Sequence, residues 1–530
     1  MQIAYIGNGS TQRYPAEFVG AKAANLARMA ALNLPVPPAF VVPIDLCAAI
    51  IEGDRDATQI LIDGLREGIA FLENATGKRF GDRRRPLLVS VRSGAARSMP
   101  GMLDTVLDLG CTLDAVHGLV RMTGHPRFAW DCRCRFLESY GSVVLGIDAA
   151  SFAQRLTGLI SVEGVKNEEG LDGESVERLA GFYYKLIEDE DHTASDDPME
   201  QLKSAAQAVY RSWTSDRART YRQLEGLEDL RGTAVTVQAM VFGNLDFTSG
   251  AGVAFSRDPS TGASQPVVDV LFASQGEDVV SGRRNPETEE AIARSVPAVA
   301  TQLRDVLTRL EQEFGDVQDV EFTIEEGKLW ILQTRSAKRT PQAALRFAIA
   351  FVKEGLVTPS QALQHLEGLD LNALAHKRLI NVPEPATHGT GASAGIAVGR
   401  AAFDSGSAKK LAASGDPVIL IRPDTSTADV AGFAASAGIV TAVGGRTAHA
   451  ALVARQMGKP CIVGATALAL DPANHSAQLA GVQIKEGDWL SIDAENGAIY
   501  LGRCNVAVER PEEELAEIER WRAESLEPPR

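Results

Sequence analysis

Short apolar runs separated by glycine and proline divide the chain into predicted strands and helices. Runs rich in β-branched and aliphatic residues predict buried strands at 87–91, 437–443 and 461–463. Longer stretches of strong helix formers predict helices at 448–457 and over most of 114–230. We therefore expect a multidomain protein that combines the α/β and α+β classes.

The helical stretch 114–230 gives little indication of chemistry. It carries aromatic residues that we expect in its core, namely Trp130, Phe136, Tyr140, Phe182 and Tyr183.

Residues 318–335 predict a β-hairpin with a tight Glu-Gly turn. Because side chains alternate along a strand, Asp319 and Glu321 share one face, and Gln333 and Arg335 share one on the returning strand. Paired oxygen ligands suit Mg2+ that bridges nucleotide phosphates, while an arginine balances charge on them. A cross-strand ion pair on an exposed hairpin would explain the charges equally well.

Arg92 is a second residue that suits a phosphate. We expect it to emerge at the end of the strand 87–91, before a loop rich in Ser, Gly and Pro. A planar guanidinium binds phosphate through paired hydrogen bonds, and the backbone of the loop around Gly101 offers further donors. A surface loop with two arginines is the alternative interpretation.

The stretch 444–458 contains one histidine, His449, between two predicted strands. Its paired glycines permit a sharp turn, and Thr447 is the expected N-cap of the helix that follows. His449 then lies in the first turn, where free backbone N–H groups and the helix dipole favour a phosphate carried on the imidazole. An ordinary polar histidine is the simpler interpretation of an isolated residue.

Composition narrows the class of protein. The chain has 530 residues, enough for about three or four domains. Its formal charge of -16 argues against a general nucleic-acid binder. No secretory signal and no apolar run of membrane-spanning length is visible, so we expect no membrane association and a cytoplasmic location. The six cysteines are scattered, and we expect reduced thiols.

Residues 444–458, read as Gly-Gly-Arg-Thr-Ala-His-Ala-Ala-Leu-Val-Ala-Arg-Gln-Met-Gly, closely resemble the phosphohistidine signature of the pyruvate phosphate dikinase family. The family pattern has Met at the place of Arg446 and Ser at the place of Ala448. Residues 86–105 resemble a second family motif almost residue for residue, and 20–29 resemble the opening of the family's nucleotide domain.

The hairpin 318–335 resembles the closing hairpin of an ATP-grasp domain, the fold that clamps ATP between two α/β subdomains. The resemblance implies Mg2+ as cofactor, ATP and inorganic phosphate as substrates, and three sets of site residues. The implied catalytic residues are His449, Arg92 and Arg335. The implied ATP-binding residues are Lys22, Arg92, Gly101, Glu277, Glu321, Gln333 and Arg335. The implied metal ligands are Asp319, Glu321 and Gln333.

The resemblance also implies the order of domains. We expect an ATP-grasp nucleotide-binding domain at 1–340, a helical linker at 341–382, a swivelling β/α phosphohistidine domain at 383–505 and a charged helical tail at 506–530. Family enzymes continue with a (β/α)8 barrel that binds pyruvate or phosphoenolpyruvate and needs about 250 residues. This sequence contains no such segment, so we expect the acceptor site on a separate chain.

The implied activity is that of a dikinase. His449 would be phosphorylated from ATP in the presence of phosphate, giving AMP and pyrophosphate, and would pass the phosphoryl group to pyruvate. Two alternatives stay open: a dikinase that acts on a different small molecule, and a nucleotide-binding regulatory protein with weak turnover. Arg422, in a motif similar to one of the family, could contact the phosphate on His449 or form an ordinary salt bridge.

Overall fold

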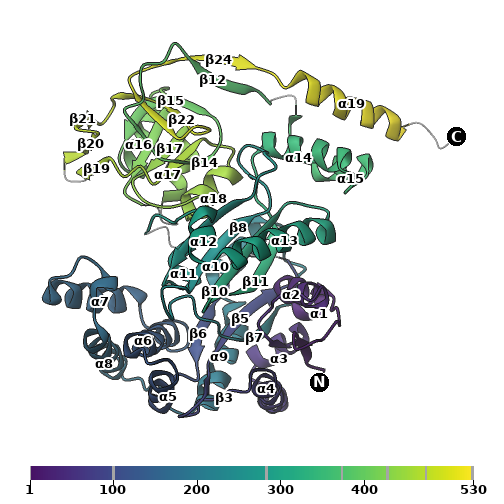
Figure 1. Ribbon diagram of the computed structural model, residues 1–530, viewed down its shortest axis with the longest axis vertical. Coiled ribbons are helices and arrows are strands. Elements are labelled where there is room, and N and C mark those ends of the chain that lie inside the picture. Colours follow the sequence, from purple (N-terminus) through teal and green to yellow (C-terminus); the bar gives the residue numbers. More distant parts are fainter. Residues whose placement is uncertain are drawn as a thin grey trace. The chain divides into compact units, whose positions relative to one another are not determined.

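The computed structural model describes residues 2–526, except for 98, 100–101, 281–283, 372–373, 425–428 and 472–473. The side chains of Val280, His449, Ser525 and Leu526 also lie outside the described part. The chain divides into two compact units, one of Met1–Leu245 with Trp330–Thr334 and one of Asp246–Leu329 with Arg335–Arg530. Both units mix helices and sheets, which confirms the mixed α/β character (Figure 1).

The first unit contains a five-stranded sheet in the order β1-β2-β7-β5-β6, in which all neighbouring strands are antiparallel. Strands β2, β5 and β7 are almost wholly buried, because most of their side chains are apolar or small. The strands are β1 (Ala4–Ile6), β2 (Ala39–Val42), β5 (Val89–Ala95), β6 (Thr105–Leu109) and β7 (Thr233–Ala239), with a short pair β3 (Arg79–Phe80) and β4 (Pro86–Leu87) beside them in sequence.

Helices make up the rest of the first unit. They are α1 (Ala16–Val19), α2 (Ala21–Ala31), α3 (Cys47–Ile51), α4 (Arg55–Thr76), α5 (Leu113–Thr123), α6 (Pro126–Val143), α7 (Ala149–Glu163), α8 (Gly173–Asp189), α9 (Pro198–Ser212) and α10 (Asp216–Leu224), with 3-10 turns at Ile44–Leu46 and Glu168–Gly170. Helices α4 and α9 contact the sheet, and α6 packs on α8.

The predicted helical content of 114–230 is confirmed, with one error in its core. Phe182 is 43% exposed, whereas the adjacent Tyr183 is 2% exposed. Neighbouring residues on a helix point about 100° apart, so one of this pair on α8 must leave the apolar face.

The second unit begins with a four-stranded sheet in the order β11-β10-β8-β9. Its elements are β8 (Gly250–Phe255), β9 (Val267–Phe272), α11 (Gly276–Val280), α12 (Glu289–Ser295), α13 (Pro297–Phe314), β10 (Gln318–Glu325) and β11 (Lys328–Ser336). The predicted hairpin is confirmed: it turns at Glu326 and Gly327, whose φ angles are 48° and 71°. Residues 330–334 of β11 cluster with the first unit.

An eight-stranded sheet in the order β13-β23-β22-β15-β16-β17-β18-β14 forms the centre of the C-terminal part. Strands β15 to β18 run parallel, and the outer strands pair antiparallel. The strands are β13 (Thr387–His388), β14 (Thr390–Ser393), β15 (Ile396–Ala402), β16 (Val418–Arg422), β17 (Gly438–Thr441), β18 (Cys461–Val463), β22 (Trp489–Asp493) and β23 (Ala498–Leu501). Its helices are α16 (Ser405–Ala413), α17 (Val430–Ala435) and α18 (His449–Gln456).

A separate three-stranded antiparallel sheet lies between β18 and β22 in the sequence. It consists of β19 (Leu468–Asp471), β20 (Ser476–Leu479) and β21 (Val482–Lys485). Buried residues of this sheet, such as Leu468 and Ile484, join the core of the larger sheet.

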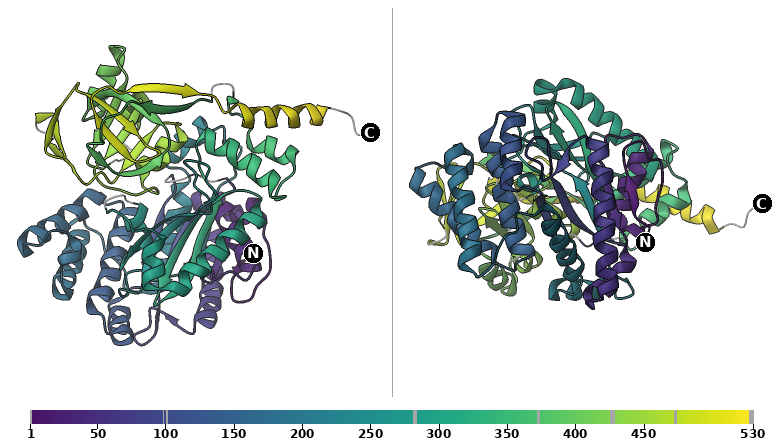
Figure 2. Two further views of the ribbon diagram at one scale, coloured as in Figure 1. Left: turned by 45° about the horizontal axis from the view of Figure 1, so that its top comes forward. Right: turned by 90° about the horizontal axis from the view of Figure 1, so that it is seen from below.

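A two-stranded ribbon brings together the chain segments before and after the eight-stranded sheet. Strand β12 (His376–Ile380) pairs antiparallel with β24 (Asn505–Glu509), and Figure 2 shows β24, in yellow, leading into α19 (Glu512–Leu526). Helix α19 packs on α14 (Pro341–Lys353) and α15 (Pro359–His365) through a small apolar core that includes Trp521.

Two local expectations are corrected. Arg92 lies in the middle of β5, because the small residues after it continue the pairing with β7 up to Ala95. The N-cap of α18 is Ala448, which makes no side-chain cap hydrogen bond, because the hydroxyl of Thr447 contacts Asp269 instead. The six cysteines are free thiols, as expected.

Candidate functional site

A pocket in the first unit brings together three of the predicted ATP-binding residues. Lys22 from α2, Arg92 from β5 and Gln333 from β11 all line it. Among the described residues that line the pocket, these two cations are accompanied by no acidic side chain. This charge favours an anion such as a nucleotide phosphate.

The position of Lys22 depends on a close approach of backbone to backbone. Gly20 precedes α2 with a φ of 82°, and a Cβ atom built there would lie 2.2 Å from the carbonyl oxygen of Gly94 on β5. Only glycine fits this position, so the first turn of α2 packs directly against the strand that carries Arg92.

Thr236 and Gln238, which the sequence did not single out, also line the pocket from β7. The Thr236 hydroxyl is buried, and no described residue forms a hydrogen bond with it. The Gln238 amide donates to the carbonyl of Pro37 at 3.2 Å. The sequence did contain a signal for them. Thr236 and Gln238 alternate with apolar residues along the strand, and polar residues two positions apart share one face of a sheet.

The predicted metal ligands Asp319 and Glu321 lie on β10, where Asp319 is 2% exposed. Its Oδ2 accepts a hydrogen bond from Nε of Arg335 at 2.8 Å. Its Oδ1 is buried, and within the described part of the chain it has no hydrogen-bond partner. Burial raises the pKa of Asp319, an effect that Arg335 opposes and Glu321 reinforces.

This arrangement suits a divalent cation. A buried carboxylate oxygen with no hydrogen-bond partner among the described residues is costly, and the nearby carboxylate of Glu321 adds further negative charge. A hard cation such as Mg2+ takes carboxylate oxygens as ligands and would neutralise the excess charge. Gln333, the third predicted ligand, lies on the same strand as Arg335, two residues before it.

Two predicted ATP-binding residues gain no structural support. Glu277 lies exposed in the first turn of α11, and Gly101 lies outside the described residues. Arg422 forms the salt bridge that the sequence left as an alternative, with Nε 3.2 Å from Oδ1 of Asp429.

His449 is the first residue of α18, and its side chain lies outside the described part of the structure. The loop before it is fixed by contacts within the same unit, to β9 and to the segment before α12. The backbone N–H groups of Gly444 and Thr447 donate to the side chains of Asn285 and Asp269, each at 3.0 Å. Such contacts set where α18 begins.

Arg446 and Arg455 form further hydrogen bonds that fix this loop. Nε of Arg446 donates to the carbonyl of Gly391 at 3.3 Å. The buried Arg455 on α18 donates to the carbonyls of Ala392 and Arg446, at 3.1 and 2.7 Å. The departure from the family pattern at Arg446 therefore adds a contact between the loop and β14.

Two known families match this chain. The family described as "Pyruvate phosphate dikinase, AMP/ATP-binding domain" matches residues 58–298 and 288–354. A second, "PEP-utilising enzyme, mobile domain", matches residues 415–497, which include His449. The chain belongs to the pyruvate phosphate dikinase family.

Relatives within the family are similar over nearly the whole chain. The chain is 40% identical to a pyruvate, phosphate dikinase of Clostridium symbiosum, over 94% of this chain and 57% of the relative. It is 40% identical to that of Rhizobium meliloti, over 95% of this chain and 58% of the relative, and 39% identical to pyruvate, phosphate dikinase 2 of Zea mays with the same coverage.

The chain thus spans somewhat over half the length of these relatives. Within the described residues, no helix combines the length and the apolar character that crossing a membrane requires.

Proposed function

We propose that this chain carries out the first half of a dikinase reaction, in which ATP phosphorylates His449. The observation that supports the proposal best is the pocket shared by Lys22, Arg92 and Gln333. Two cations and an amide from three separate sequence motifs line this one pocket, which supports a shared role in binding ATP. Two cationic side chains that line one pocket favour a ligand that carries negative charge.

In this proposal Arg92 and Lys22 bind the phosphates of ATP, and the hydroxyl of Thr236 supplies a further contact. Asp319 and Glu321, with Gln333, would hold Mg2+, which would supply charge neutralisation at the phosphates. Arg335 orients the carboxylate of Asp319 and balances charge on the transferring group.

Every phosphate group of ATP is accounted for in the proposed reaction. An imidazole nitrogen of His449 attacks the β-phosphorus of ATP, the bond to the α-phosphate oxygen breaks, and AMP leaves. Inorganic phosphate then accepts the terminal phosphoryl group, so that pyrophosphate leaves and a single phosphoryl group remains on His449. Positioning and electrostatic stabilisation supply most of the acceleration in such transfers.

We propose the predicted domain order as the framework for this reaction: an ATP-grasp domain at 1–340, a helical linker at 341–382, a swivelling domain at 383–505 and a helical tail at 506–530. The pairing of β12 with β24 supports it, because both chain connections of the eight-stranded sheet run through one narrow ribbon. A ribbon of this kind can act as a hinge that lets His449 visit two sites.

Pyruvate is the acceptor that we propose for the phosphoryl group, since the similar dikinases carry it in their names. We propose that a pyruvate-binding barrel of the kind found in the family provides the acceptor site. Transfer to another small molecule is the alternative within the same chemistry.

The test uses ATP labelled separately at the β and γ positions, with Mg2+ and phosphate. We expect acid-labile β label on the protein, release of AMP, and loss of both in His449→Ala. Chase with pyruvate, alone and with a separately purified pyruvate-binding barrel of the family, then tests the acceptor. ATP binding without AMP or protein label would defeat the proposal and favour a regulatory nucleotide-binding protein.

A further inference from the structure

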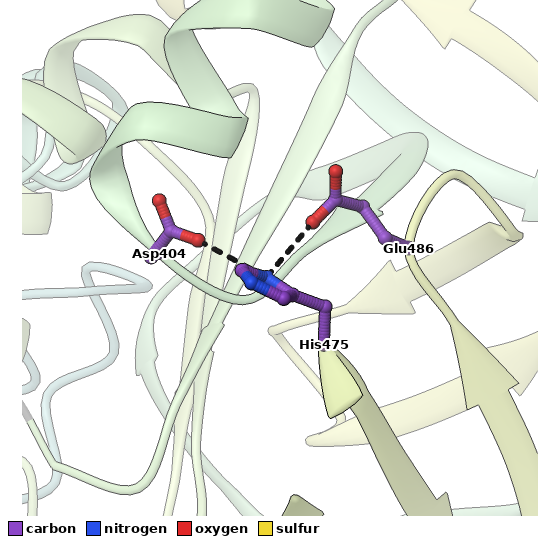
Figure 3. A group of neighbouring side chains, drawn as sticks. All are labelled: Asp404, His475 and Glu486. Atoms are coloured by element: carbon purple, nitrogen blue, oxygen red, sulfur yellow. Dashed lines mark ion pairs between the residues drawn. The ribbon is translucent and has the colours of Figure 1, made fainter. Parts of the chain in front are cut away.

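Three side chains on the surface of the C-terminal part converge at a point that the proposed reaction does not use. They are Asp404, His475 and Glu486, and Figure 3 shows both carboxylates directed at the same imidazole nitrogen. Nδ1 of His475 lies 3.4 Å from Oδ2 of Asp404 and 3.3 Å from Oε2 of Glu486.

The three residues come from three places in the fold. Asp404 precedes α16 and caps it, with Oδ1 accepting the N–H of Ser407 at 2.8 Å. His475 directly precedes β20, and Glu486 directly follows β21, so these two face each other at the open end of one hairpin. The group therefore joins the small sheet of β19, β20 and β21 to the start of α16.

We propose that Asp404, His475 and Glu486 form a binding site for a divalent transition-metal ion of the Zn2+ class. Zn2+ bonds to nitrogen and oxygen ligands at about 2.0–2.2 Å, which places ligand atoms of a tetrahedral site about 3.3 Å apart. The two distances from Nδ1 of His475, 3.3 and 3.4 Å, match that spacing.

The same distances fit a simple ion pair less well. A charge-assisted N–H···O bond is about 2.7–2.9 Å long. A single Nδ1–H directed at two carboxylate oxygens can point well at only one of them. A metal ion, in contrast, needs all three atoms to face a common point.

Ser407 contacts both carboxylates independently of the histidine, and its single hydroxyl proton is donated to one of them at a time. Its hydroxyl lies 2.8 Å from Oδ2 of Asp404 and 2.8 Å from Oε2 of Glu486, the same two oxygens that face His475. Hydrogen bonds of this kind orient metal ligands and restrict their motion. The site is thus held in place by a fourth side chain.

Charge and chemistry favour the Zn2+ class over Mg2+ and Ca2+. Two carboxylates and a neutral imidazole carry two negative charges, which a divalent ion balances. Imidazole is a poor ligand for the hard cations and a good one for Zn2+, Ni2+ and Co2+. A surface recess beside the site lets water reach it as a fourth ligand. The recess is lined by Asn474, His475, Ser476, Gln483, Lys485 and Glu486.

Direct Zn2+ titration of the untagged, chelator-treated chain, with a competing fluorescent chelator and excess Mg2+, tests the site. We expect one tight equivalent for the wild type. His475→Ala and the conservative Glu486→Gln should each weaken binding about tenfold or more. Excess Mg2+ keeps the proposed nucleotide-site carboxylates from contributing to the signal.

His376→Ala is the matched control, because Nε2 of His376 faces a single carboxylate oxygen, that of Glu495, at 3.9 Å. It should bind Zn2+ as the wild type does. The Co2+ absorption spectrum should lack thiolate charge-transfer bands, which separates this site from the six cysteines. Thermal unfolding without metal shows whether each variant is folded.

Equal Zn2+ affinity of wild type and folded Glu486→Gln would overturn the proposal, as would absence of binding by the wild type. Neither result depends on whether His449 becomes phosphorylated, so this site and the proposed dikinase function can fail separately.

Discussion

Asp269 on β9 accepts two hydrogen bonds from Thr447, one from its backbone N–H at 3.0 Å and one from its hydroxyl at 3.2 Å. The two residues are 178 positions apart in the sequence, and Thr447 lies two residues before His449. Asp269 is 4% exposed, so the contact is shielded from water. It anchors the loop of the proposed phosphohistidine to the sheet that also carries Asp319.

We predict that Asp269→Asn slows phosphorylation of His449 about tenfold while leaving ATP affinity unchanged. Hydrogen bonds to a charged group contribute about 1.5–3 kcal/mol, and an amide can keep only part of this. Single-turnover labelling with β-labelled ATP measures the rate, and calorimetry measures ATP affinity.

Asp246→Asn is the control for that experiment. Asp246 accepts hydrogen bonds from Thr248 and Ser249 in a turn of the same unit, so its loss should cost similar bonds without slowing the transfer. An unchanged rate in folded Asp269→Asn would show that the loop contact has no part in the reaction.

The carboxylate of Asp269 should also make the stability of the protein depend on pH. Burial raises the pKa of Asp269, and Arg446 and the hydrogen bonds from Thr447 only partly offset this. When folding raises the pKa of an acid, the protonated acid stabilises the fold. This contribution is complete at pH values below the pKa of the acid in the unfolded chain. That contribution is lost as pH rises through the folded pKa.

The free energy of unfolding of wild type minus that of Asp269→Asn should therefore fall as pH rises from about 4, by at most about 1.4 kcal/mol per pH unit. Urea denaturation of both proteins at matched pH values measures this difference. The contributions of the other carboxylates are common to both proteins and cancel. A difference that grows with pH would contradict the assignment.

The sequence predicted well those features that depend on neighbours along the chain. The hairpin at 318–335 and the strand at 461–463 follow from local patterns, and β10, β11 and β18 appear where expected. Alternation along β10 was enough to place Asp319 and Glu321 on one face.

Features that join distant segments could not be predicted in this way. Thr447 is a good N-cap by residue type, yet its hydroxyl bonds to Asp269, a residue that no local pattern connects with it. The grouping of Asp404, His475 and Glu486 depends on two turns and a helix start that meet only in the folded domain.

Substitution of Thr236 should change ATP binding without reducing the stability of the fold. Thr236→Val removes a buried hydroxyl that forms no hydrogen bond with any described residue but keeps the shape of the side chain. We expect the ATP dissociation constant to rise about five- to tenfold, the value of one hydrogen bond. Stability should stay equal or rise by about 1 kcal/mol, because an unpaired buried polar group is lost.

Calorimetric ATP titration and urea denaturation measure these two effects, and Thr236→Ser, which keeps the hydroxyl, should bind ATP nearly as the wild type does. Unchanged affinity in Thr236→Val would place the nucleotide phosphates and sugar away from this hydroxyl.

Asp319→Asn tests the proposed metal site. The amide keeps the volume of the carboxylate but removes the charge that both Arg335 and a bound cation require. We expect the Mg2+ concentration for half-maximal phosphorylation of His449 to rise about tenfold, equivalent to about 1.4 kcal/mol. Measurement of protein label against free Mg2+ at saturating ATP gives this value directly.

Asp316→Asn separates metal binding from the simple loss of an ion pair. Asp316 lies three residues earlier and forms a paired contact with Arg339, with both carboxylate oxygens at 2.6 Å from guanidinium nitrogens. Both variants should lose stability, because each removes a carboxylate that accepts hydrogen bonds from an arginine. Only Asp319→Asn should change the Mg2+ dependence. An equal change in both variants would mean that Asp319 serves the fold of the hairpin and that the metal ligands lie elsewhere.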